Sequence, residues 1–251
     1  MIKGIKAYIK KKQAWWNNIS NGQHYKQEQK YLTDITFDFI NTIRIIAMYS
    51  NRASHIYNSF LTITTIDDLI ESSMAILMMV NNGIHNASKR ELRYILEMSV
   101  KYGVVDWTLM GKSLEDKIQH LDHNIPKSTI SPIEDICMPF TEDVLIEFKT
   151  DVKRIYSQRC RYVHPSKEQL IEQLKNIKEG YTIGFESAEM FTKMNKAIFE
   201  VYDIILAILF SCFGNSMSGD IFEQVLDLNK KWKFHKGKYT SQISKVLHYS
   251  V

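Results

Sequence analysis

The stretch RIYSQRCRYVHPS, Arg154 to Ser166, constrains both the fold and the function of this chain. Its apolar residues follow a helical pattern, and Pro165 ends that helix because proline disfavours α geometry for the residue before it. Ser166 and Gln169 then match a capping box that begins the next helix. We therefore predict a helix, a junction at His164 and a second helix.

Arg159 and His164 are the candidate functional pair in this stretch. If the helix continues through Val163, they lie roughly 7.5 Å apart along its axis and roughly 140° apart around it. They could still converge on one phosphate, because arginine is long and the helix unwinds at His164. The negative end of a helix dipole also favours the protonated imidazole. An arginine that holds a phosphate and a histidine that exchanges protons suit phosphodiester cleavage.

Helical periodicity extends outward from this stretch over most of the chain. Apolar residues at helical spacing predict a long helix from Tyr25 to Tyr49, and the apolar segment Glu186–Phe213 predicts a central helix or a dimer face. Further helices are expected over residues 2–18, 51–61, 65–80, 88–107, 113–124, 141–163, 166–179 and 218–234, with a turn at 214–219 and a long loop over 124–139. The chain has only 4 Pro and 10 Gly. We predict an all-α fold, a bundle of long antiparallel helices with peripheral N- and C-terminal helices.

Local side-chain patterns add detail to two of these helices. Thr65 and Ser88 are each followed three residues later by an acid, which predicts capped helix starts at both positions. Arg93 precedes Glu97 by one helical turn. We interpret that pair as a brace between neighbouring helices, in preference to a substrate-binding pair.

The composition, with 45% hydrophobic and 24% charged residues, is typical of a globular protein. The length allows one large domain or two small ones, and we expect a single helical domain over residues 1–251. The longest apolar run, Ile204 to Phe213, is about half of a membrane span, so no transmembrane segment is expected. No signal peptide is recognisable. The three cysteines lack paired spacing, and His120 with His123 is interpreted as a solvated helix face. We therefore predict neither metal nor cofactor, and a cytoplasmic location.

The net charge of +4 is unevenly distributed. Residues 1–27 and residues 229–251 each contain six lysines and no acid, which leaves −8 for the middle of the chain. We expect Trp15 and Trp16 to dock the N-terminal segment on the body, with a membrane-surface or nucleic-acid contact as the alternative. We expect the C-terminal segment to contact RNA or a partner, where Trp232 and Tyr239 could stack on bases. The alternative has both segments folded back on the acidic middle.

RCRYVH, Arg159 to His164, resembles the signature of the HEPN superfamily, in which an arginine is followed after four to six residues by a histidine. The longer run YSQRCRYVHPS is similar to the Tyr-to-His-Pro-Ser segment of bacterial helical members. SKRELRYILEMSVKYGVVDW, Ser88 to Trp107, is similar to an earlier core helix of such proteins. The resemblance covers roughly residues 65–215 and implies a HEPN-like core.

The resemblance implies a metal-independent endoribonuclease that acts as a toxin or an antiviral-defence effector. Two protomers of such a protein share one cleft, so we expect a homodimer, an RNA substrate and an antitoxin or sensor partner. Arg159 would hold the phosphate and His164 would shuttle the proton, which leaves a 2′,3′-cyclic phosphate. Arg161 would assist with the RNA backbone, and Tyr156 would order the site or simply pack.

Two alternatives stay open. HEPN nucleases usually carry a polar residue directly after the arginine, whereas this chain has Cys160. A non-catalytic HEPN-like binding or scaffold module, with His164 as a helix-junction residue, is the first alternative. The second is a peripheral membrane or effector protein that works through its Trp- and Lys-rich ends.

Overall fold

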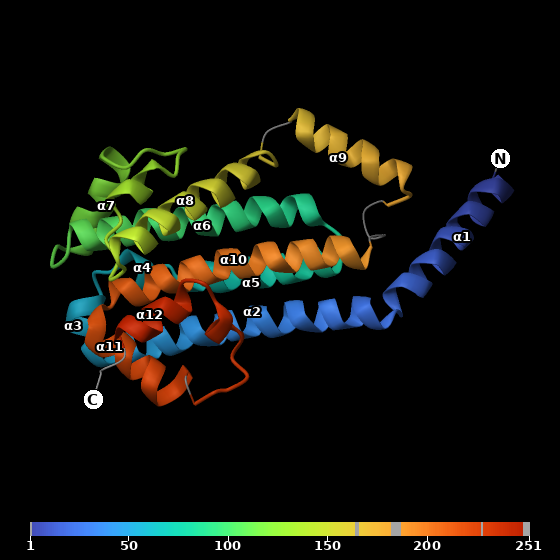
Figure 1. The fold of residues 1–251 in the computed structure, drawn as a ribbon. Coiled ribbons are helices and arrows are strands. Elements are labelled where there is room, and N and C mark those ends of the chain that lie inside the picture. The colour runs from blue at the N-terminus through green and yellow to red at the C-terminus, as the bar shows by residue number, and fades with distance from the viewer. Residues whose placement is uncertain (1, 164–165, 182–186, 227, 248–251) are drawn as a thin grey trace.

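The computed structural model describes residues 2–163, 166–181, 187–226 and 228–247. Every secondary-structure element in these ranges is a helix, which confirms the all-α prediction. Five long helices form the bundle: α2 (Gln23–Ser50), α5 (Ile66–Asn81), α6 (His85–Thr108), α8 (Glu142–Cys160) and α10 (Ala188–Cys212) (Figure 1). Successive helices of this set run in opposite directions.

Shorter helices surround the bundle. They are α1 (Ile2–Ser20), α3 (Ser54–Tyr57), α4 (Leu61–Thr64), α7 (Leu114–His123), α9 (Lys167–Lys178), α11 (Gly214–Ile221) and α12 (Thr240–Leu247), with the 3-10 turns η1 (Asn51–Ala53), η2 (Ser131–Asp135) and η4 (Lys233–Lys236) and the π turn η3 (Phe222–Leu226). Helices α1 and α9 lie at the same end of the bundle, and α3, α7 and α11 lie toward the other (Figure 1).

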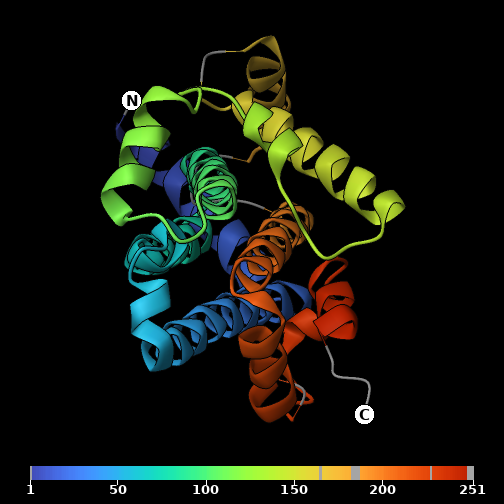
Figure 2. The same ribbon diagram turned by 90° about the vertical axis from the view of Figure 1, so that its left-hand side faces the viewer.

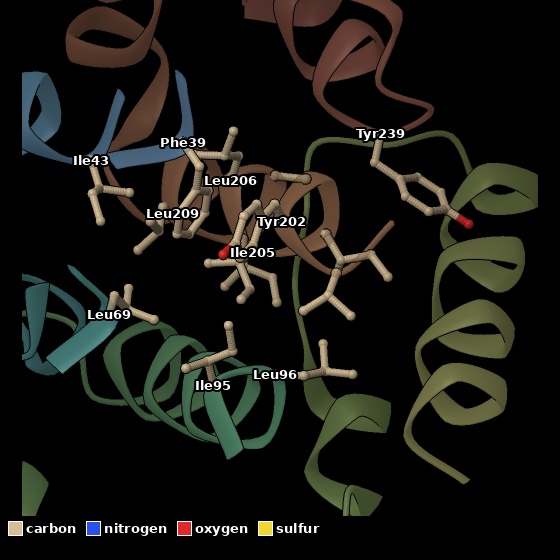
Figure 3. Packing of buried hydrophobic residues seen from close by; sticks show 14 of the residues in the cluster. Phe39, Ile43, Leu69, Ile95, Leu96, Tyr202, Ile205, Leu206, Leu209 and Tyr239 are labelled. Carbon is tan, nitrogen blue, oxygen red and sulfur yellow. The ribbon is translucent and has the colours of Figure 1, made fainter. Parts of the chain in front are cut away.

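Helix α10 is the centre of the structure. Viewed along the bundle, it is surrounded by α2, α6 and the C-terminal helices (Figure 2). Every side chain from Val201 to Cys212 is buried, as expected for a helix that is apolar on all sides. Tyr202 stacks on Phe39 of α2 with 4.1 Å between ring centroids (Figure 3). The prediction of a central helix is therefore confirmed.

The apolar periodicity of the second helix also corresponds to burial. Ile35, Phe39, Ile43 and Ile46 are all fully buried on the face of α2 that meets the core. The helix extends from Gln23 to Ser50, a few residues beyond the predicted bounds at its start. Spacing of apolar residues thus identified both the helix and its inner face.

Predicted helix starts differ in how the first turn is capped. The Ser166 hydroxyl accepts from the Gln169 backbone N–H at 3.1 Å, which confirms the Ser166 half of the predicted capping box. Thr65 precedes α5, but its hydroxyl donates to the Leu61 carbonyl. Ser88 lies inside α6, which begins at His85, and its hydroxyl donates to the carbonyl of that residue. The cap predictions at Thr65 and Ser88 are wrong, because a hydroxyl can bond back to the preceding turn instead.

The C-terminal part of the chain differs most from expectation. The predicted turn at 214–219 is wrong, because α11 begins at Gly214. The helix predicted over 218–234 is confirmed only for its first part, where α11 continues into the π turn η3. Beyond it, η4 and α12 pack on α2 and α10. Trp232 and Tyr239 are buried, at 4% and 2% exposure. Neither aromatic ring is available to stack on RNA bases, so this part of the expectation for the C-terminal segment is wrong.

Hydrogen bonds and ion pairs hold the C-terminal segment against the body. The Asp203 carboxylate on α10 accepts from the backbone N–H groups of Tyr239 and Thr240 at 2.9 and 3.0 Å. Lys238 pairs with Asp151 at 2.7 Å, and Lys233 with Asp34 at 3.3 Å. These contacts agree with the alternative prediction for this segment, in which it folds back on the acidic middle of the chain.

The N-terminal helix is attached to the body by its last turns. Trp16 meets Tyr25 of α2 edge-on, with ring centroids 5.3 Å apart, and packs against the core. Trp15 lies 5.7 Å from the Tyr181 ring. The predicted docking of these two tryptophans is confirmed. Among the helices that the structure describes, none is both long and apolar enough to span a bilayer.

Candidate functional site

A cavity of about 1020 Å³ lies at the end of the bundle where α8 ends and α9 begins. Its walls are the start of α6, the last turns of α8, helix α9 and the first turns of α10. Apolar atoms come from Ile84, Met190, Met194 and the ring of Tyr162. The cavity thus lies directly beside the arginine that the sequence singles out.

The cavity wall is rich in charge of both signs. Six cationic side chains and four carboxylates line it among the residues placed by the structure. The cations are Lys89, Arg154, Arg159, Lys175, Lys193 and Lys196, and the carboxylates are Glu172, Glu179, Glu189 and Glu200. The excess of positive charge favours an anionic ligand, and the carboxylates can orient a ligand that also offers donors.

Arg159, on the last turn of α8, is the more buried of the two arginines that line this wall among the described residues, at 9% exposure. Burial lowers the pKa of its guanidinium from the ordinary value, but an arginine keeps its charge in proteins at neutral pH. Its Nε is buried and has no hydrogen-bond partner among the described residues. A buried donor of this kind costs free energy until an acceptor arrives. A phosphate oxygen is a suitable acceptor.

Lys89, Tyr162 and Glu172 form a cluster on the wall beside Arg159. Lys89 Nζ donates to one Glu172 oxygen at 3.1 Å, and the Tyr162 hydroxyl donates to the other at 2.6 Å. Lys89 Nζ also lies 3.9 Å from the centre of the Tyr162 ring. These contacts join α6, the end of α8 and α9. Although burial favours the neutral acid, the bonds from Tyr162 and Lys89 leave the pKa of Glu172 below its ordinary value.

His85 also lines the cavity, at the first position of α6. Burial, assisted by the charge of Lys89, lowers its pKa from 6.5 to about 4. The imidazole is therefore neutral at neutral pH, the form that can accept a proton. It brings a proton acceptor to the cavity that Arg159 also lines.

The structure describes only some of the residues that the sequence grouped. Arg159 lines the cavity, whereas His164 lies outside the described residues. Arg161, the residue that follows α8, is exposed and does not contribute to the described lining. Its predicted contact with the RNA backbone stays a prediction.

Tyr156 faces away from the cavity, toward α6. Its hydroxyl accepts from Arg93 at 2.7 Å and donates to Glu97 at 3.0 Å. Arg93 and Glu97 are themselves paired at 3.1 Å. The predicted brace between helices is confirmed, and the position of Tyr156 favours packing over contact with substrate.

Sequence reasoning did not single out Lys89, Glu172, Tyr162 or His85. Lys89 and Glu172 are 83 residues apart, so no local spacing connects them. Tyr162 lies within the stretch that resembles the HEPN signature, and Lys89 within the stretch Ser88 to Trp107. The only sequence signal that could have identified Tyr162 and Lys89 was that each is a polar residue within a stretch that resembles the family. Within the described residues, no group of three or more His, Cys, Asp or Glu side chains is arranged to hold a metal ion.

Comparison of the chain with protein-family models, with curated proteins and with solved structures found no match.

Proposed function

We propose that this protein is a metal-independent, HEPN-like endoribonuclease in which Arg159 holds the scissile phosphate. The observation that carries the proposal is the buried Arg159 guanidinium, whose Nε lacks a partner among the described residues in the wall of a 1020 Å³ cavity. The resemblance of the Arg159 to His164 segment to the HEPN signature supports the same chemistry.

The proposed reaction is transfer of the phosphoryl group to the neighbouring ribose. The 2′-OH loses its proton and attacks phosphorus, while the bond to the 5′ oxygen breaks and that oxygen takes up a proton. The products are a 2′,3′-cyclic phosphate and a 5′-OH. Arg159 would offset the charge that develops on the phosphate oxygens. His164 would carry the proton, and His85 is the second candidate for that role.

The assembly proposed with this chemistry is a homodimer with a shared cleft, as the family resemblance implies. Each protomer would contribute one Arg159 and one His164, and no metal or cofactor takes part. RNA is the substrate, and an antitoxin or sensor would control a toxin or antiviral-defence effector. A cytoplasmic location fits this role.

A second candidate is a non-catalytic HEPN-like binding module. Cys160 follows Arg159 where nucleases of this kind carry a polar residue. Such a module would bind a ligand in the same cavity without cleaving it.

Cleavage assays on single substitutions test the proposal. Wild type is expected to cleave RNA in EDTA and to leave cyclic-phosphate ends. Arg159→Lys keeps the charge but loses the planar fork, so the rate should fall about 100-fold or more with a smaller loss of affinity. Arg154→Lys is the matched control, because Arg154 lines the same cavity but is 45% exposed and paired with Asp151 at 3.0 Å. This control should cleave like wild type.

His164→Ala and His85→Ala identify the proton carrier. Loss of cleavage in a folded His164→Ala protein supports the assignment by resemblance. If cleavage is lost in His85→Ala but not in His164→Ala, His85 is the proton carrier. RNA binding by wild type without any cleavage would reject the nuclease and leave the binding module.

A further inference from the structure

The first turns of α1 present an apolar stripe that nothing in the described structure covers. Ile5, Tyr8 and Ile9 are 54%, 61% and 58% exposed. They lie three and four residues apart, so they share one face of the helix. Trp16 and Ile19 continue that face and are packed against the core. The helix is thus fixed at its last turns and extends away from the bundle at its start (Figure 1).

Lysines flank the same stripe. At 100° per residue, Lys6 and Lys11 fall about 110° to either side of its midline, and Lys10 lies farther round. All three are exposed. No acid occurs anywhere in residues 1–27. Lys12 is separate, because its Nζ donates to the Gly180 carbonyl and lies 4.8 Å from the Trp15 ring centre.

This combination fits the surface of an anionic lipid bilayer. A helix that binds in the interface has an apolar face bordered by lysines, and the lysines add attraction to anionic headgroups. A helical partner would need acids to match these lysines. Helix α9 also exposes an apolar stripe, including Leu170 and Leu174, but it carries three lysines and no excess of acids. Pairing of α1 with α9 between two copies is therefore not favoured by charge.

RNA is a poorer match than lipid. Phosphate contacts would use the lysines but would leave Ile5 and Ile9 in water. A bilayer surface engages both the charged and the apolar side of the helix. We propose that α1 attaches this protein to anionic membrane surfaces, with Ile5, Tyr8 and Ile9 at the boundary of the acyl chains and the lysines at the lipid phosphates. The attachment is independent of the proposed cleavage of RNA.

Co-sedimentation of the full chain with vesicles tests this attachment. Wild type should bind vesicles of phosphatidylcholine mixed with phosphatidylglycerol and should bind pure phosphatidylcholine weakly. Each lysine near the surface contributes about fivefold to the partition coefficient, so Lys6→Gln with Lys11→Gln should lower it about 25-fold. Ile5→Gln with Ile9→Gln should reduce binding to background, since glutamine keeps helix propensity but removes the apolar face. Leu170→Gln with Leu174→Gln on α9 is the matched control and should bind like wild type.

Other outcomes would overturn the proposal. Equal loss of vesicle binding in the α9 control would mean that any exposed apolar side chain causes it. In a second outcome, wild type does not bind anionic vesicles and the Ile5→Gln, Ile9→Gln variant has a lower sedimentation coefficient than wild type. That result would make α1 a contact between copies of the chain. RNA binding that depends on Lys6 and Lys11 without vesicle binding would make α1 an RNA contact. Circular dichroism of each variant checks that the helices persist.

Discussion

At the scale of single residues, the polar groups around the cavity are held in defined charge states by their surroundings. Glu172 is kept ionised by donors from Lys89 and Tyr162, whereas His85 is kept neutral by burial. Arg159 stays cationic, and its buried Nε has no hydrogen-bond acceptor among the described residues. A neutral imidazole and a cationic guanidinium in one cavity wall are a chemically useful pair.

The low pKa of His85 predicts a specific loss of stability in acid. Between its ordinary value of 6.5 and its folded value of about 4, the unfolded chain binds a proton that the folded chain does not. Stability therefore falls as the pH drops through that window, by about 3 kcal/mol. His85→Gln should flatten this part of a urea-unfolding profile, whereas His55→Gln, at an exposed histidine, should leave it unchanged. An unchanged slope in His85→Gln would contradict the buried neutral imidazole.

At the scale of elements, a buried ion pair attaches α7 to the bundle. Lys117 of α7 donates to Asp106 of α6 at 3.0 Å, and both side chains have 0% exposure. Asp106 also accepts from the backbone N–H groups of Leu61 and Thr62, each at 2.9 Å. One carboxylate thus connects α4, α6 and α7.

Removal of the lysine should be costly because it leaves the carboxylate buried without its partner charge. Lys117→Ala is expected to lower the free energy of unfolding by about 3–5 kcal/mol in urea titrations. Lys127→Ala is the matched control, since its pair with Asp122 at 2.9 Å is exposed to solvent. The control should unfold like wild type. Equal midpoints for the two variants would refute the importance of the buried pair.

At the scale of the whole molecule, the basic C-terminal segment closes over the acidic body. Tyr239 lies between α12 and α8 (Figure 3), and its hydroxyl donates to Asp151 at 2.8 Å. Gly237 has no side chain where it passes Asp203, and a Cβ there would collide with that carboxylate. Segments far apart in the sequence are thereby joined across α8, α10 and the C-terminal residues.

Loss of this closure should affect stability more than RNA binding. Asp203→Ala leaves two buried N–H groups at the start of α12 without acceptors, so we expect a loss of about 2–4 kcal/mol and a lower melting temperature. Asp203→Asn keeps one carbonyl oxygen and should lose less. The dependence of RNA binding on salt should be the same in all three proteins. A shallower salt dependence in Asp203→Ala with an unchanged melting temperature would restore the C-terminal segment as an RNA contact.

The sequence by itself determined the helical class, the stripe of Ile35, Phe39, Ile43 and Ile46, and the Ser166 cap, because these depend on hydrogen bonds and spacing within a few residues. It also pointed to Arg159. Tertiary structure decided the contacts between residues that are distant in the sequence. It buried Arg159 beside the pair Lys89 and Glu172, which are 83 residues apart. It also turned Tyr156 toward α6 and buried Trp232 and Tyr239 in the body. Side chains distant in sequence meet only where helices pack, and packing sets which of them are buried, paired or left with a donor to offer.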